Sequence, residues 1–153
     1  MAVKVDIEID REFTVSADKA AAFALLSDVP GSASHFPKVD QLVDLGDNTF
    51  RWEMEKIGLG GHSIQTVYAS QYFSDEAEGS ISWEPIKGEG NSLVSGSWEI
   101  TEDGEGAKLN FTTSAKLTLP LPGLLKMAIS PVVKHEFNSM VDEYIENLQA
   151  ALA

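Results

Sequence analysis

The chain has no cysteine, which excludes disulfides and thiol catalysis and leaves the redox state of its compartment unreadable. No uninterrupted apolar run approaches the roughly 18–20 residues that a membrane-spanning helix needs. The first residues alternate with charged ones and lack the apolar core of a signal peptide. We therefore expect no membrane span, and a cytoplasmic location by default.

Basic residues are scarce, with 11 Lys and Arg against 24 Asp and Glu, for a formal net charge of −13. Such a surface repels phosphate backbones and anionic lipid headgroups, so nucleic acid is not an expected partner. The acidity is typical of a highly soluble surface, and a basic protein partner is the alternative explanation. The length of 153 residues favours one domain, residues 1–153, with a true hydrophobic core.

Apolar residues recur at helical spacing along the last thirty residues, 121–152, and form a wide stripe on one side. The stripe includes Leu124, Val132, Phe137, Met140 and Tyr144. Because proline lacks an amide proton and crowds the preceding turn, we expect the helix to kink or restart at Pro131. The sequence thus predicts a long amphipathic C-terminal helix that must lie on an apolar surface.

The rest of the chain predicts the sheet that provides this surface. Residues 3–15 alternate between apolar and charged side chains, as in a half-buried strand. Ser16 is a good N-cap for a following alanine-rich helix, and a short second helical turn is expected before Phe36. Six further strands, separated by turn residues, are predicted at 39–45, 49–57, 62–73, 81–85, 92–101 and 108–119.

These elements predict an α+β fold in which a curved, seven-stranded antiparallel sheet wraps around the long C-terminal helix. Such a grip can leave an apolar cavity for a small molecule. Each inward aromatic residue alone is typical of an ordinary core, and only the whole set indicates a cavity. The side of the 62–73 strand that faces inward is ambiguous. The predicted lining is Trp52, Met54, Thr66, Tyr68, Trp83, Trp98, Phe111, Thr113, Phe137, Met140 and Tyr144.

Sequence motifs for zinc, calcium, phosphate or dinucleotide binding are missing, and no cofactor is predicted. The histidines, His35, His62 and His135, are widely spaced and do not predict a metal site. His35, in the loop before the second strand, and the hydroxyls of Tyr68 and Tyr144 are candidate proton-transfer groups. The simpler interpretation of His35 is an exposed loop residue.

The order of elements resembles the START-like, or SRPBCC, helix-grip proteins, which include polyketide cyclases and dehydrases and lipid-transfer domains. The resemblance is strongest in four short sequence segments, residues 13–30, 35–39, 81–83 and 96–100. It implies an apolar pocket beneath the terminal helix, but no universal catalytic residue. Three functions stay open: a binder or carrier of a hydrophobic or aromatic molecule or lipid, a cyclase or dehydratase acting on such a ligand, and an interaction module of a larger complex.

Overall fold

The computed structural model describes residues 2–59 and 61–153, and it contains one long helix, two short helices and nine strands within those ranges. The elements in chain order are β1 (Val3–Val15), α1 (Lys19–Ser27), α2 (Val29–Ala33), β2 (Val39–Gly46), β3 (Thr49–Met54), β4 (Ile57–Leu59), β5 (His62–Ile64), β6 (Val67–Asp75), β7 (Ser80–Ile86), β8 (Ser92–Asp103), β9 (Gly106–Leu119), the 3-10 turn η1 (Gly123–Leu125) and α3 (Lys126–Ala151).

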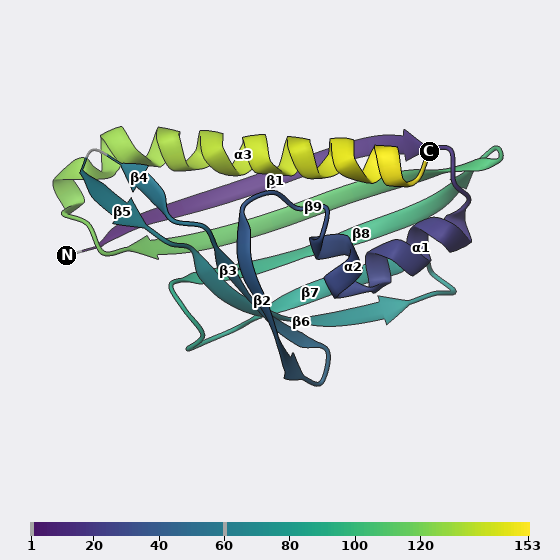
Figure 1. The fold of residues 1–153 in the computed structure, drawn as a ribbon, viewed down its shortest axis with the longest axis horizontal. Helices are drawn as coiled ribbons and strands as arrows, with labels where there is room; N and C mark the ends of the chain where they lie inside the picture. Colours follow the sequence, from purple (N-terminus) through teal and green to yellow (C-terminus); the bar gives the residue numbers. More distant parts are fainter. Residues whose placement is uncertain (1, 60) are drawn as a thin grey trace.

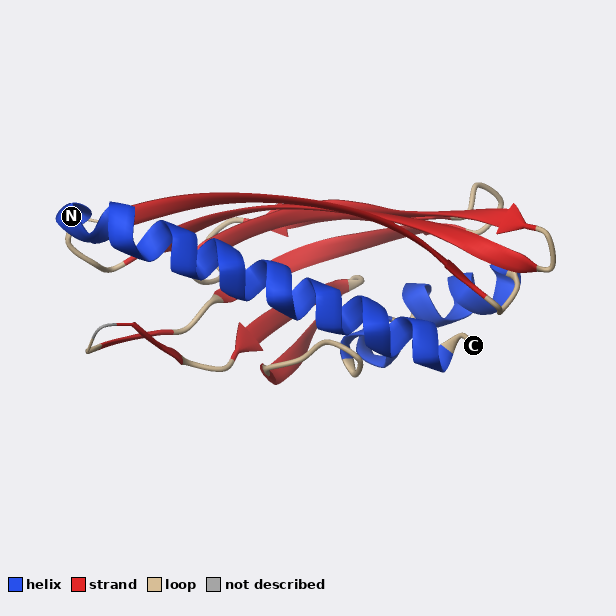
Figure 2. Ribbon diagram, turned by 90° about the horizontal axis from the view of Figure 1, so that it is seen from above, coloured by secondary structure: helices blue, strands red, loops and turns tan. Residues whose placement is uncertain are grey.

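Seven strands form one antiparallel sheet in the order β1-β9-β8-β7-β6-β3-β2, while β4 and β5 form a separate hairpin. The predicted α+β fold is confirmed. The pairing of β1 with β9 runs without a break from Val3 opposite Leu119 to Val15 opposite Ala107. Their apolar side chains alternate onto one buried face, as the sequence predicts. Figure 1 shows the order of the elements, and Figure 2 shows the long strands bowed over α3.

Helix α3 lies against the concave face of the sheet through seven buried residues, listed here from its start: Ile129, Val133, Met140, Val141, Tyr144, Ile145 and Leu148. The expected restart at Pro131 is wrong, because the helix begins at Lys126 and continues through the proline. Near a helix start, proline removes only the bond to the carbonyl of Met127, and this residue is open to water. Leu124 and Val132, which the predicted stripe includes, are exposed.

Two further predictions, the N-cap at Ser16 and the continuous strand over 62–73, are wrong because side chains form hydrogen bonds with backbone groups there. The N-cap of α1 is Asp18, not Ser16, and its carboxylate accepts the amide of Ala21 at 2.9 Å. The backbone amide of Ala17 donates a hydrogen bond to the carbonyl of Leu152, at the end of α3, at 2.8 Å. These bonds keep residues 16 and 17 outside the helix, which begins at Lys19.

The strand predicted over 62–73 is interrupted between β5 and β6. The Asn91 side chain donates to the carbonyl of Gln65 at 2.8 Å and accepts the amide of Val67 at 3.0 Å. The carbonyl of Thr66 accepts a hydrogen bond from the backbone amide of Met54 at 3.0 Å. With these backbone groups occupied, the β5 segment leaves the main sheet and pairs with β4 instead.

The hydrophobic core is divided into two clusters. The larger one joins β1, α1 and strands β7 to β9 to α3. The smaller one joins α2 to β3 and contains Val29, Ala33, Phe50, Trp52, Met54 and Met140. Four partly buried aromatic residues contact both clusters: Phe36, Tyr68, Tyr72 and Phe137. The gap that these aromatic rings border is where a cavity lies.

Polar contacts link α3 both to strand β1 and to the segment between α2 and β2. Arg11 on β1 bonds to Asp142 at 3.0 Å and to Asn138 at 2.9 Å. On the other side, Asn147 donates to the backbone carbonyl of His35 at 2.8 Å, and Lys38 pairs with Glu136. Among the described residues, no helix has both the length and the apolar character to cross a bilayer.

Candidate functional site

A cavity of about 90 Å³ lies inside the grip, between the sheet, helices α1 and α2, and α3. Its lining comes from every layer of the fold, with Ile7 and Ile9 from β1, Leu26 from α1 and Val141 from α3. None of the described residues that line it carries a charge at neutral pH. This interior therefore matches a neutral guest, because an unpaired charge moved into it would lose its hydration without compensation.

Aromatic rings form a closed circuit around the cavity. Phe36 contacts Trp52 edge-on at a centroid distance of 5.8 Å, and it contacts Tyr144 at 4.9 Å. On the sheet, Trp52 stacks on Tyr68 at 5.8 Å with an interplanar angle of 12°. The indole of Trp52 is joined to Tyr72 by a hydrogen bond, and the circuit then continues through the ring contacts of Tyr72, Trp83, Phe111, Trp98 and Tyr144, whose centroids lie between 4.6 and 6.1 Å apart. Such flat faces and polar edges suit an aromatic guest.

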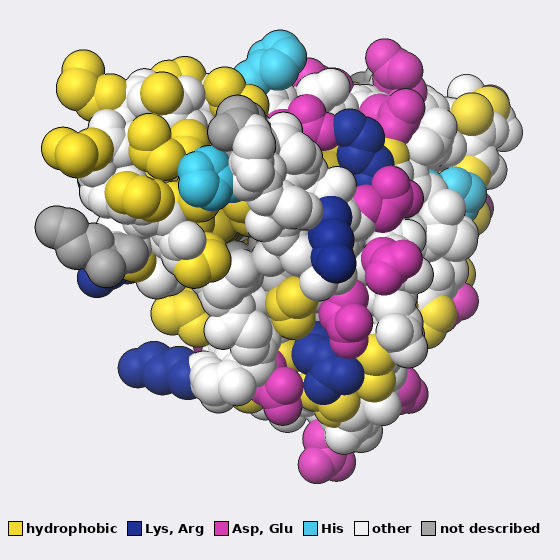
Figure 3. All heavy atoms as spheres, turned by 60° about the vertical axis from the view of Figure 1, so that its left-hand side comes forward, with side chains coloured by type: hydrophobic (Ala, Val, Ile, Leu, Met, Phe, Trp, Pro, Cys, Tyr) yellow, Lys and Arg dark blue, Asp and Glu magenta, His cyan; other side chains and the backbone are white. Residues whose placement is uncertain are grey.

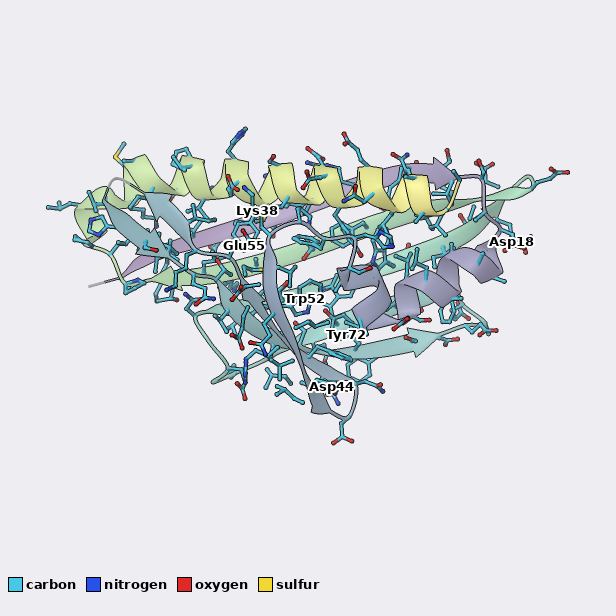
Figure 4. All side chains as sticks on the ribbon, in the orientation of Figure 1. Asp18, Lys38, Asp44, Trp52, Glu55 and Tyr72 are labelled. Atoms are coloured by element: carbon cyan, nitrogen blue, oxygen red, sulfur yellow. The ribbon has the colours of Figure 1, made fainter. Side chains whose placement is uncertain are left out.

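Two hydrogen bonds tie together polar atoms of this lining. The indole nitrogen of Trp52 donates to the Tyr72 hydroxyl at 3.0 Å. Figure 4 labels these two residues, which lie together beneath α2. The hydroxyls of Ser32 on α2 and Tyr144 on α3 are 2.5 Å apart. The second bond joins the smaller core cluster to the terminal helix across the cavity.

Unlike the hydroxyls of Tyr72 and Tyr144, the Tyr68 hydroxyl forms no hydrogen bond with any of the described residues. Thr113 also lines the cavity, but its hydroxyl already donates to the carbonyl of Ser95 at 3.2 Å. A hydroxyl inside an apolar cavity gains a hydrogen bond when a guest brings a polar atom. Tyr68 is thus the group best placed to orient a bound molecule.

Burial raises the pKa of all three tyrosines. For Tyr144 burial raises the pKa to about 12, although the hydrogen bond with Ser32 opposes this effect. The pKa of Tyr68 rises well above its usual value of 10.0, also through burial. At neutral pH these hydroxyls stay protonated, so they are suited to donate hydrogen bonds to a guest and not to act as bases.

A groove on the outer surface lies next to the cavity, between the α1–α2 corner and the turn that joins β2 to β3. Val29 and Tyr72 line both the groove and the cavity, so these two side chains form the partition between them. The Tyr72 ring contacts Phe50 on the groove side at 6.0 Å and Trp83 on the cavity side at 5.7 Å.

Nine of the eleven residues predicted to line a cavity do so. The exceptions are Thr66 and Met140, which are buried elsewhere: Met140 packs in the smaller core cluster. Of the candidate proton-transfer groups, Tyr68 and Tyr144 line the cavity, whereas His35 does not. His35 contributes its backbone carbonyl to the bond with Asn147 instead.

Sequence reasoning missed lining residues of two kinds. Tyr72 has the same strand parity as Tyr68, so alternation would have found it once the inward side of β6 was known. Ser32 and Phe36 come from α2 and the loop after it, where no periodic pattern marks an inward side chain. Only the packing of α2 against α3 reveals them.

Comparisons with solved structures show the same fold at low sequence identity. A START superfamily protein from Mycobacterium smegmatis has a TM-score of 0.69 at 16% identity, with 95% of this chain and 96% of that chain covered. The Zhui aromatase/cyclase from Streptomyces sp. R1128 has a TM-score of 0.60 at 18% identity, covering 96% and 91%. The protein TTHA0849 from Thermus thermophilus has a TM-score of 0.63 at 20% identity, covering 95% and 99%.

No curated protein sequence matches the chain. The family model described as polyketide cyclase / dehydrase and lipid transport matches residues 6–153, which is nearly the whole sequence. The START-like resemblance carried by the local sequence phrases is confirmed by this match and by the solved structures. The chain belongs to the polyketide cyclase / dehydrase and lipid transport family.

Proposed function

We propose that this protein binds or carries a neutral hydrophobic or aromatic small molecule in the cavity beneath α3. The observation that carries the proposal is the lining, which combines a circuit of aromatic rings with a few hydroxyls and, among the described residues, no charged side chain. A guest of this class is held by burial of its apolar surface and oriented by a hydrogen bond to Tyr68.

The volume of the cavity limits how the guest enters. At about 90 Å³ it is smaller than the roughly 150 Å³ of an apolar cavity that takes up benzene. A ligand of that size or larger therefore requires the two core clusters to move apart. Because the partition consists of only Val29 and Tyr72, we place the entrance at the outer groove beside α2.

The intrinsic fluorescence of the protein supplies the test, since all three tryptophans, Trp52, Trp83 and Trp98, line the cavity. Titration with a neutral apolar fluorescent probe such as N-phenyl-1-naphthylamine, and with naphthol, should change tryptophan emission saturably, at one site per chain. Naphthol is the decisive ligand, because it is neutral and carries one hydroxyl for Tyr68.

A matched pair of variants distinguishes the cavity from the surface. Ala115→Leu places a larger side chain in the lining and should abolish naphthol binding. Ala24→Leu adds the same atoms at an exposed position of α1 and should leave binding unchanged. Absence of saturable binding, or equal binding by both variants, would exclude the cavity as the site.

An enzyme of the cyclase or dehydratase class is the second candidate, and the two tyrosine hydroxyls in the cavity lining, those of Tyr68 and Tyr144, favour it. Here the cavity would hold a flexible substrate in a reactive conformation. Tyr68→Phe and Tyr144→Phe separate the two functions. A carrier should lose affinity by about 1–3 kcal/mol per buried hydrogen bond, whereas an enzyme should lose turnover and still bind. His35→Ala serves as the control outside the cavity.

A further inference from the structure

One end of the molecule exposes large apolar side chains. Leu124 is 96% exposed, Met127 is 90% exposed and Val132 is 45% exposed, all within nine residues that span η1 and the start of α3. Exposed prolines extend this surface at positions 120, 122 and 131, and we call residues 120–132 the apolar end. Figure 3 brings this end of the molecule forward and shows hydrophobic side chains gathered at its upper left.

The charge around the apolar end is opposite to that of the whole chain. Residues 106–135 contain no Asp or Glu, although the chain has 24. The same stretch carries four lysines, of which Lys126 and Lys134 lie exposed on α3 within or beside the apolar end. Nearby carboxylates are matched by cations: Asp6 is paired in register with Lys116, and Glu136 forms an ion pair with Lys38. The apolar end is thus locally cationic.

We propose that the apolar end docks on the surface of an anionic lipid membrane, with Leu124 and Met127 inserted among the lipids and Lys126 and Lys134 against the headgroups. Apolar side chains beside lysines are what interfacial binding to anionic lipid requires. Side chains exposed to 90% or more make little contact with their own protein, and lipid can surround them completely. This proposal does not depend on what the cavity binds.

The net charge of −13 does not prevent this docking. At physiological ionic strength, interactions between exposed charges are largely screened beyond about 8 Å. Helix α3 alone, with 26 residues, extends over roughly 39 Å at 1.5 Å per residue. The carboxylates on the far part of the molecule therefore lie many screening lengths from a membrane that touches the apolar end, and the local lysines determine the interaction.

Flotation of the full chain with phosphatidylcholine vesicles, prepared with and without phosphatidylserine, tests the proposal. We expect binding that requires phosphatidylserine and weakens as salt is added. The double variant Leu124→Gln/Met127→Gln should lower the partition constant roughly a hundredfold. The double variant Lys126→Gln/Lys134→Gln should lower it roughly thirtyfold.

Leu45→Gln is the control, since Leu45 is an exposed apolar residue on β2, away from the apolar end, and its loss should leave flotation unchanged. Unfolding midpoints of all variants should match the parent chain, because the substituted side chains are exposed. Failure to float with either vesicle, equal flotation with both, or the same loss for Leu45→Gln would overturn the proposal. So would a dimer in analytical ultracentrifugation that the Leu124→Gln/Met127→Gln variant dissociates, since a second copy would then cover the surface.

Discussion

The hydrogen bond between Ser32 and Tyr144 joins α2 to α3 across the cavity, and its removal should destabilise the fold in a pattern that depends on which partner is lost. Both residues are buried, with exposed fractions of 7% for Ser32 and 5% for Tyr144, and their hydroxyl oxygens are 2.5 Å apart. Tyr144→Phe leaves the Ser32 hydroxyl without this partner, and Ser32→Ala removes the partner of Tyr144.

A buried hydroxyl that loses its partner costs about 1–3 kcal/mol, so each single variant should lower the free energy of unfolding by that amount. In the double variant neither hydroxyl remains, and its cost should fall short of the sum of the two single costs by at least about 1 kcal/mol. For a chain of this size, each kcal/mol shifts the midpoint of thermal unfolding by about 2–4 °C.

Urea unfolding followed by tryptophan emission measures all four proteins, because every tryptophan lies beside the cavity. Tyr68→Phe provides the control, since its hydroxyl has no partner among the described residues. Combined with Ser32→Ala, it should give additive costs. If the Ser32 and Tyr144 substitutions are themselves additive within about 0.5 kcal/mol, the hydrogen bond does not couple α2 to α3.

Two further predictions concern pH and packing. The folded-state pKa values of the three tyrosines are raised, to about 12 for Tyr144, so their contribution to stability is complete below pH 10 and is lost as the pH rises towards 12. Urea unfolding should therefore show a free energy of unfolding that falls progressively as the pH rises above 10. Tyrosinate absorbance near pH 10 with the fold intact would contradict this. Gly96→Ala should lower the urea midpoint, since its Cβ would lie 2.3 Å from the Thr112 carbonyl oxygen and 2.5 Å from the Trp83 ring. Gly58→Ala, with no atom within 4 Å, should not change it, and equal midpoints would refute the packing argument.

Much of the fold could be predicted because its pattern is local. The alternation in β1 and β9 specifies which side chains face inward, and the helical stripe of α3 identifies the buried face from Ile129 to Leu148. Errors arose where distant groups compete for the backbone. The carboxylate of Asp18 caps α1 in place of Ser16, and the side chain of Asn91 interrupts the strand before β6.

By itself the sequence determined the order along the chain of the strands in the main sheet, the family and an aromatic interior that contains Trp52, Trp83 and Trp98, because strand and helix periods are properties of neighbouring residues. Only the tertiary structure decided that Ser32 meets Tyr144 from 112 residues away, and that Tyr72 separates the cavity from the outer groove. The cavity of about 90 Å³ likewise depends on how two core clusters approach one another. Distances and volumes of this kind arise from the packing of elements far apart in the chain, which no local pattern of residues encodes.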